Sequence, residues 1–539
     1  MNRFAVAAAA LLAPALVLLG AGHAAADTLV VCTEASPDAL NANLSTANTS
    51  FDVSEQVADR LVEMEIGGSM LKPGLAESWD ISPDGLRYTF HLRHGVKWQS
   101  NAAFTPSRDF DADDVVFTFQ RMFDRSHPWN KVGGGSYPMF AGLLEGPLKA
   151  VTKVDDYIVV FEMKQPHAPL LATLTVQAFS ISSAEYAGAI DKAGGTRDAY
   201  DLNPIGTGPF QLVQYQKDSL IRFRAFPDFW GAKGGMPERA AKVDQLVFAI
   251  TPDASVRFAK LRANECQVAR YPNPADLDAM RATPGVVVQG ATIASLGYLA
   301  FMTPKKPFDD RRVREALATA IDLDNLVKAV WQGTGMPTAS AVSPGMFGHT
   351  DALQPRHQDI ARAKALLAEA GLANGFSTEL WALPVARAYN PNGRRAAEMI
   401  QADWAKIGVK ATIVTYEWGE YLRRARSGDA DIAMLGSTWD YPDPSQQLIS
   451  FTCEAMNTGR NIPKWCNRAY SDLVAQANVI TDTDARAKLY QQAQQVIFDE
   501  VPLMLFADSQ VFVPVRSNVK GFKLHFFGGQ PFGGVSITP

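Results

Sequence analysis

The sequence predicts an α/β protein built from two or three domains. At 539 residues, the chain is too long for one hydrophobic core of ordinary size. From about residue 290 onward, amphipathic helical patterns alternate with short strand-like runs, which is typical of an α/β unit with a mostly parallel sheet. Before about residue 200, short strand patterns dominate and predict a separate α+β domain.

The α+β domain is predicted from two strand patterns and a turn. Over residues 86–92, apolar and polar residues alternate with the period of a half-buried strand. The preceding residues 80–85 carry strong turn formers. Residues 157–163 form a second strand pattern, which we expect to be the antiparallel neighbour of the first. A helix is expected over residues 53–66.

The second half of the chain is predicted from apolar helical faces and their end signals. Gly371 and Gly408 each follow such a face, as glycine does just beyond a helix C-terminus. The helices that we expect cover residues 255–264, 313–321, 361–370, 397–407, 420–426 and 484–499, and the strands cover 28–32, 219–226, 245–250, 409–416 and 432–435.

The segment Asp431–Pro444 holds the leading site candidate. The apolar run Ile432–Leu435 predicts a buried strand, which ends at a Gly-Ser-Thr turn and is followed by Trp439 and Asp440. In open α/β sheets, ligands bind just outside the carboxyl ends of strands. Asp440 is therefore a candidate ligand residue, although a turn role before Pro442 explains it equally well.

Two further loop residues are candidates. Tyr137 follows the glycine run at 133–135, and Arg387 lies in a loop bounded by prolines at 384 and 391. Taken alone, Arg387 is better explained as a surface arginine.

The sequence predicts no metal, no cofactor and no enzyme activity. Asp109–Asp114 begins like a calcium loop, but Asp114 stands where that loop needs glycine and Gln120 where it needs glutamate. These carboxylates instead suit the first turn of a helix that runs to Met122. Eight histidines are scattered singly, and the nucleophile-elbow, P-loop and H-E-x-x-H patterns are missing.

The N-terminal sequence is typical of an exported protein. An apolar run from Phe4 to Gly20 follows Arg3, and three alanines at 24–26 supply a cleavage site, so residues 1–26 form a signal peptide. A membrane anchor is the alternative, although the run is short for a bilayer span. The net charge of −5, with no basic stripe, argues against nucleic acid as a partner.

Four cysteines in an exported protein suggest two disulfides, for which three connectivities exist. Cys453 and Cys466 flank a polar loop and are the natural pair, which leaves Cys32 with Cys266. Free buried thiols are the alternative. Metal ligation is disfavoured because the chain contains no C-x-x-C.

The chain resembles the peptide/nickel solute-binding family of ABC transporters, and within it the dipeptide-binding branch. The resemblance covers essentially the whole chain after the signal peptide. The stretches that carry it are Pro73–Asp80, Tyr88–Trp98, Ala112–Phe119, Asp201–Gln211, Thr251–Arg257, Asn264–Val268, Tyr271–Asp276 and Tyr416–Tyr421.

The resemblance implies a two-lobed periplasmic binding protein fold of the α/β class with an extra third domain. Lobe I would comprise residues 27–60, 208–290 and 510–539, the extra α+β domain 61–207, and lobe II 291–509. Cys32 and Cys266 would then lie in the same lobe.

The resemblance implies that the chain binds a dipeptide or short peptide and delivers it to an ABC permease in the inner membrane. It would not alter the peptide chemically. Asp440 would hold the ligand's α-ammonium and Arg387 its α-carboxylate. Further ligand contacts would come from Thr46 and from Ser437, Thr438 and Trp439. The protein is expected to be a monomer. A chemoreceptor is a further candidate partner.

The sequence departs from the dipeptide-binding pattern beside the proposed anchor. That pattern has tryptophan where this chain has Ser437, and glycine where it has Trp439. Residues two apart on a strand face the same side, so the indole ring could occupy a similar place. A haem- or glutathione-binding member of the same family is the alternative function.

Overall fold

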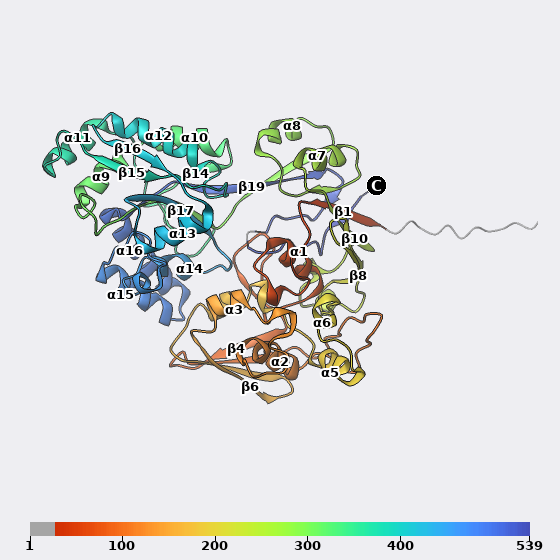
Figure 1. The fold of residues 1–539 in the computed structure, drawn as a ribbon. Coiled ribbons are helices and arrows are strands. Elements are labelled where there is room, and N and C mark those ends of the chain that lie inside the picture. Colours follow the sequence, from red (N-terminus) through yellow and green to blue (C-terminus); the bar gives the residue numbers. More distant parts are fainter. Residues whose placement is uncertain (1–26, 526, 539) are drawn as a thin grey trace, which may run out of the picture.

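The computed structural model describes residues 27–525 and 527–538 and contains three main sheets (Figure 1). The proposed signal peptide, residues 1–26, lies outside the described residues. We name three units by their sheets: the first lobe has the eight-stranded sheet, the second lobe the five-stranded sheet, and the extra domain the four-stranded sheet. The boundaries of these units along the chain stay a prediction.

The first lobe is built around a mixed sheet whose strands come from the beginning, middle and end of the chain. Strand β1 pairs with β10 and β11 in parallel, and β10 pairs with β9 antiparallel. The three strands predicted for this region are confirmed. The sheet contains β1 (Thr28–Thr33), β8 (Phe210–Gln216), β9 (Leu220–Ala225), β10 (Gln245–Ile250), β11 (Val268–Ala269), β12 (Val286–Thr292), β14 (Gly335–Pro337) and β19 (Ala507–Arg516).

Helices of the first lobe differ from the prediction in one place. The helix expected over residues 53–66 is instead α1 (Asn48–Val57), followed by strand β2 (Val62–Met64). Eight of the ten α1 residues are buried, including polar ones, so its burial does not show the one-sided pattern by which a surface helix is recognised. Helix α7 (Ala254–Arg262) confirms the prediction for residues 255–264, and α8 (Leu277–Arg281) is short.

The extra domain contains the predicted antiparallel strands. In β5 (Arg87–Leu92), alternate residues are buried, and β5 pairs antiparallel with β7 (Ile158–Met163), as predicted. Strands β4 (Ala76–Ile81) and β6 (Leu148–Asp155) complete the sheet. Its helices are α2 (Ala112–Phe123), α3 (Pro138–Leu143), α4 (Leu170–Thr173), α5 (Ala184–Ala193) and α6 (Ala199–Leu202).

Helix α2 confirms the interpretation of the aspartate cluster. Asp111 is the N-cap, its side chain accepts from the Asp113 N–H at 2.9 Å, and Asp114 completes a capping box. The carboxylates satisfy N–H groups that the first turn of a helix leaves free.

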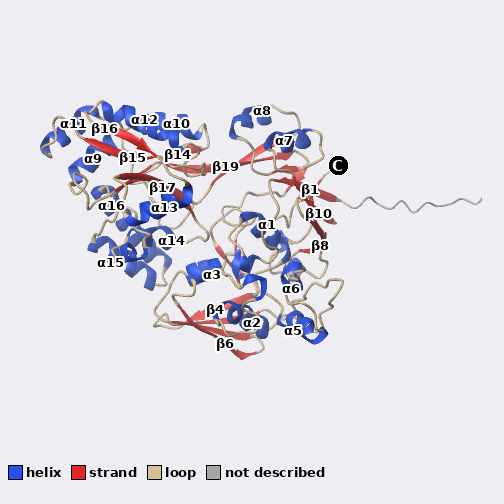
Figure 2. Cartoon of the chain, viewed as in Figure 1, coloured by secondary structure: helices blue, strands red, loops and turns tan. Residues whose placement is uncertain are grey.

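The second lobe has helices on both sides of its sheet, with α10 and α12 above strands β15 and β16 in Figure 2 and α13 and α16 below. Every helix and strand predicted for residues 313–499 is confirmed. The elements are β13 (Ser295–Phe301), β15 (Ser377–Trp381), β16 (Lys410–Val414), β17 (Ile432–Thr438), β18 (Leu503–Leu505), α9 (Arg311–Thr319), α10 (Leu323–Trp331), α11 (Ile360–Glu369), α12 (Gly393–Ala405), α13 (Trp418–Ser427), α14 (Ser445–Leu448), α15 (Arg468–Val479) and α16 (Thr483–Glu500).

The sheet of the second lobe is mixed rather than mostly parallel. Strands β16, β15 and β17 pair in parallel, whereas β13 pairs antiparallel with both β17 and β18. All seven residues of β13 are buried, so this strand occupies the interior of the lobe. Within the described residues, each helix is too short or too polar to cross a membrane.

Both proposed disulfides are present. Cys453 pairs with Cys466 across 13 residues, and Cys32 pairs with Cys266 across 234 residues. The second bridge joins the end of β1 to the segment just before β11, its neighbour in the sheet.

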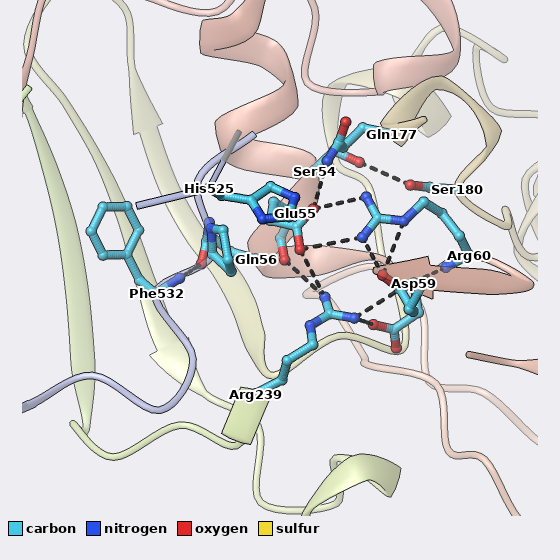
Figure 3. A network of polar contacts seen from close by, with 12 residues as sticks. Ser54, Glu55, Gln56, Asp59, Arg60, Gln177, Ser180, Arg239, His525 and Phe532 are labelled. Atoms are coloured by element: carbon cyan, nitrogen blue, oxygen red, sulfur yellow. Dashed lines mark hydrogen bonds and ion pairs between the residues drawn. The ribbon is translucent and has the colours of Figure 1, made fainter. Parts of the chain in front are cut away.

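A buried ion network joins the first lobe to the extra domain (Figure 3). Arg60 Nη1 lies 2.8 Å from Glu55 Oε2, and Arg239 Nη1 lies 2.9 Å from Asp59 Oδ1 and 3.1 Å from Glu63 Oε1. These five side chains are at most 3% exposed. The Gln177 amide, from the extra domain, donates to Glu55 Oε2 at 2.8 Å. The network places three carboxylates against two guanidinium groups away from water.

Two buried histidines should make the protein less stable in mild acid. Burial lowers the pKa of His525, beside Arg60 and Arg239, to about 4, and burial lowers the pKa of His167 likewise to about 4. An unfolded histidine titrates near pH 6.5, so these groups give their full stability above pH 6.5 and lose it as pH falls toward 4.

We expect each histidine to contribute on the order of 2 kcal/mol to this loss. Urea unfolding of the wild type and of His525→Gln at pH 7.5 and pH 4.5 isolates the contribution of His525. All other titrating groups are present in both proteins, so their effects cancel in the comparison. A smaller pH difference in His525→Gln is the expected result, and equal differences would contradict it.

Candidate functional site

A cavity of about 620 Å³ lies between the two lobes and is the candidate ligand site. The first lobe contributes Arg270, Tyr271, Phe512 and His525, and the second lobe contributes Arg387, Thr438, Trp439 and Asp440. A cavity with walls from two lobes suits a ligand that is enclosed when the lobes approach each other.

Asp440 lies on the cavity wall, two residues after the end of β17, where the sequence predicted a ligand residue. The β17 strand runs through to Thr438, so the predicted Gly-Ser-Thr turn is wrong; Gly436 and Ser437 pair with Gly297 and Leu296 of β13. The pairing extends the strand because these three residues find partners on β13. The carboxylate thus follows a strand that is buried over Ile432–Leu435 and is held by β13 along its whole length.

Gln446, on α14, holds Asp440 in place. Its Oε1 accepts from the Asp440 N–H at 2.8 Å, and its Nε2 donates to Asp440 Oδ2 at 2.6 Å. Burial raises the pKa of Asp440, and the bond from Gln446 opposes this rise. Among the described residues, no cation pairs with this carboxylate. A ligand cation would lower its pKa and stabilise its charged form.

Arg387 lies on the same cavity wall, in the loop between β15 and α12. Its backbone exchanges two hydrogen bonds with Asn390, of 3.1 and 3.0 Å, which form a tight loop. The exposed guanidinium donates to the neighbouring Ala386 carbonyl at 3.2 Å, and its Cζ lies 5.3 Å from the centre of the Trp418 ring. No described carboxylate pairs with it, so it is free to bind an anion.

The other residues proposed in this region are placed as follows. Thr438 is exposed and lines the cavity. Trp439 also lines it, but its ring is only 3% exposed and packs in the core of the second lobe. The Ser437 hydroxyl hydrogen-bonds to Gln447 and does not line the cavity. Thr46 is exposed two residues before Asn48, which does line it.

Tyr137 is placed elsewhere. Its ring is 6% exposed in the core of the extra domain, and its hydroxyl donates to the Asn130 carbonyl at 2.8 Å and accepts from Arg121 Nε at 3.0 Å. The adjacent glycines misled the prediction, because they lie within and at the end of a short helical turn, Val132–Gly134, rather than in a binding loop. We therefore treat Tyr137 as a core residue.

Three residues on the first-lobe wall were not predicted. Arg270 pairs with buried Asp52, and its Nη2 donates to the Tyr271 hydroxyl at 3.2 Å. Tyr271 has a left-handed φ of 52°, a conformation unusual for a residue with a side chain and common at functional sites. It begins one of the stretches that carry the family resemblance. His525 comes from the C-terminal tail, where no motif marks it.

The cavity wall carries two opposite charges that could each meet a charged ligand group. These are a carboxylate and a guanidinium, each without an ionic partner in the described part of the chain. Such a pair matches a small molecule with one positive and one negative end. Within residues 27–525 and 527–538, no group of three or more His, Cys, Asp or Glu is placed to hold a metal.

Comparisons with known proteins agree with this fold. The family model of the bacterial extracellular solute-binding proteins, family 5 Middle, matches residues 70–458. The dipeptide-binding protein of Escherichia coli is 50% identical over 95% of both chains. Heme-binding protein A of Haemophilus influenzae is 42% identical over 95% of this chain and 92% of its own.

A solved structure shows the same similarity. The crystal structure of a dipeptide-binding protein from Pseudoalteromonas, in complex with Met-Leu, matches with a TM-score of 0.74 and 35% identity, over 95% of this chain and 100% of its own. Each of these matches spans nearly the full length of both proteins. The chain therefore belongs to the bacterial extracellular solute-binding proteins of family 5.

Proposed function

We propose that this protein binds dipeptides and other short peptides with free termini and delivers them to an ABC permease, without altering them chemically. The observation that carries the proposal is the pair of unpartnered charges, Asp440 and Arg387, on the wall of one cavity between the lobes. The dipeptide-binding relatives at 50% and 35% identity support it.

The two proposed anchors would make the site selective for zwitterionic ligands, which carry one positive and one negative charge. Burying an ammonium or a carboxylate without a partner costs several kcal/mol. Asp440 would accept hydrogen bonds from the ligand ammonium, and the Arg387 guanidinium would donate two parallel bonds to its carboxylate. Because the distance between these anchors is set by the protein, they would select ligands by length rather than by side chain.

The remaining space suits variable side chains. A cavity of about 620 Å³ leaves room for side chains and for bridging water around a dipeptide. Its first-lobe wall includes Leu277, Phe512 and Val513, which offer apolar contact without hydrogen-bond demands. A ligand that touches both lobes would favour their approach, since it stabilises the closed arrangement only.

The proposed setting is the periplasm. An exported monomer that captures peptides there would present its closed form to the permease in the inner membrane. A chemoreceptor would be a second protein that binds the closed form. The two disulfides suit an oxidising compartment such as the periplasm.

Replacing Arg387 tests the carboxylate anchor. In Arg387→Met, we expect the affinity for a free dipeptide to fall about 10- to 100-fold, because its carboxylate loses a charged partner on binding. The C-amidated dipeptide should bind the variant and the wild type equally. Isothermal titration calorimetry measures both affinities. Arg423→Met, an exposed arginine on the same lobe, is the matched control; an equal loss with both ligands would contradict the assignment.

Native mass spectrometry of freshly purified protein separates peptide binding from the haem or glutathione alternative. Peptide binding predicts bound species with masses of di- or tripeptides. A Soret absorption band or a bound mass of haem or glutathione would favour the alternative. Incubation with a peptide should leave the peptide uncleaved.

A further inference from the structure

The three consecutive residues Trp439, Asp440 and Tyr441, which follow β17, place their side chains in three different parts of the molecule. Trp439 packs in the core of the second lobe, Asp440 lies on the cavity wall, and Tyr441 packs in the core of the extra domain. Tyr441 is 6% exposed. It is the one second-lobe residue in the described chain whose ring belongs to the extra-domain core. The backbone of Asp440 is thus held from both sides.

The extra domain encloses the Tyr441 side chain. Burial raises the pKa of its hydroxyl, which interacts with the side chains of Ser445, on α14, and of Thr173, at the end of α4. Thr173 is 1% exposed, and its neighbours Leu170 and Ala172 belong to the same core. Burying a large aromatic ring is favourable, so its burial in the extra domain holds the loop in one arrangement.

The next anchor lies two residues further along. Asp443 is 1% exposed, and its Oδ2 lies 2.8 Å from Arg486 Nη2 on α16. The Asp443 N–H donates to the Tyr441 carbonyl at 2.9 Å, and Asp443 Oδ1 accepts from the Ser445 N–H at 2.9 Å. This bond starts α14, from which Gln446 holds the Asp440 carboxylate. Tyr441 therefore connects the extra domain to Asp443 and, through its own N–H at 3.3 Å, to the Gln446 side chain that holds Asp440.

The second lobe and the extra domain also meet elsewhere, since Met64 of β2 packs in the second-lobe core. The Ala168 N–H donates to the Asn478 carbonyl at 2.8 Å, and the Ser69 hydroxyl donates to the Gly345 carbonyl at 2.8 Å. A cavity of about 390 Å³, lined by Leu171 of the extra domain and Phe347 of the second lobe, lies between the units. Tyr441 is thus a buried connection in an interface that also contains open space.

We propose that Tyr441 is a positioning residue through which the extra domain orients Asp440 toward the ligand ammonium. The inference rests on the proposed function, because it assigns that ammonium to Asp440. Loss of the Tyr441 ring would free the loop, so that Asp440 would sample several orientations and bind the ammonium less often. Ligand contacts that do not involve the ammonium would be unaffected.

The test compares two ligands and three variants. The ligands are a free dipeptide and its N-acetylated form, and their affinities are measured by calorimetry and by competition. The variants are Tyr441→Phe, Tyr441→Leu and Tyr186→Leu, the last of which removes a ring from the same extra-domain core on α5. Thermal unfolding of each variant reports its stability separately.

We expect Tyr441→Leu to reduce the preference for the free amine about 10-fold, a change of about 1.4 kcal/mol, with little change for the N-acetylated ligand. Tyr441→Phe keeps the ring and should retain the preference, and Tyr186→Leu should lose stability only. If Tyr441→Leu does not unfold cooperatively, Tyr441→Met replaces it.

An unchanged preference in folded Tyr441→Leu would overturn the inference, as would an equal loss with both ligands or an equal loss of preference in Tyr186→Leu. If the wild type itself shows no preference for the free amine, the assignment of Asp440 fails, and the inference fails with it. The wild-type measurement therefore distinguishes the two failures.

Discussion

Asp440→Asn is expected to weaken the binding of a free dipeptide at least about 100-fold. The substitution keeps the shape of the side chain and one oxygen to accept a hydrogen bond, but it removes the charge that would face the ligand ammonium. Breaking an enclosed charge pair by neutralising one partner costs about 3–5 kcal/mol, because the other charge remains away from water. No described cation is near enough to take its place.

Calorimetry with the free and N-acetylated dipeptides measures this effect. The N-acetylated ligand has no charge to lose and should bind Asp440→Asn and the wild type with similar affinity. Asp429→Asn, on the same lobe but paired with Arg424 at the surface, is the matched control and should behave as the wild type. Equal weakening of both ligands would show that Asp440 supports the site without contacting the ammonium.

Arg239→Met is expected to lower the free energy of unfolding by about 3–5 kcal/mol. Arg239 is 1% exposed and lies against Glu55, Asp59 and Glu63. Without it, only Arg60 would face three buried carboxylates. Burial already raises the pKa of Glu63, so we expect this carboxyl to take up a proton in the variant and to limit the loss.

Urea unfolding at pH 7.5 measures the change. The matched control is Arg125→Met, since Arg125 pairs with Glu145 at 3.1 Å but its side chain is 85% exposed, and an exposed pair contributes about 0–1 kcal/mol. A loss in Arg239→Met as small as that of the control would contradict the view that the network joins the first lobe to the extra domain.

Much of the fold follows from local sequence patterns. Strand β5 was predictable because one face is buried and the other is not, and helices α11 and α12 because each has one apolar face and a glycine at its end. Strand β13 was missed because it is buried on both faces, so Ser295–Phe301 shows no alternation. The mixed direction of the sheet follows from this strand.

The second-lobe half of the site was predictable, and the first-lobe half was not. Asp440 follows an apolar run that ends abruptly, a signal that the sequence contains. The proposed role of Arg387 came from family resemblance, since its loop has no distinctive pattern. Arg270, Tyr271 and His525 reach the cavity from segments far apart in the chain, and only the folded arrangement brings them together.

The structure shows what surrounds Ser437 and Trp439, the two residues that depart from the family pattern. Ser437 hydrogen-bonds to Gln447, next to the Gln446 that holds Asp440. The Trp439 ring is buried, and its indole N–H has no acceptor in the described structure. These two residues therefore bear on the support of the proposed anchor more than on open pocket surface.

The most direct test of the central claim is calorimetric titration of ligand-free protein with a dipeptide and with its N-acetylated and C-amidated forms. The proposed pair of anchors predicts saturable binding of the free dipeptide and much weaker binding of each blocked form, because each lacks one charge. No heat with any di- or tripeptide, or equal affinity for all three forms, would contradict the claim that Asp440 and Arg387 select a short zwitterionic peptide.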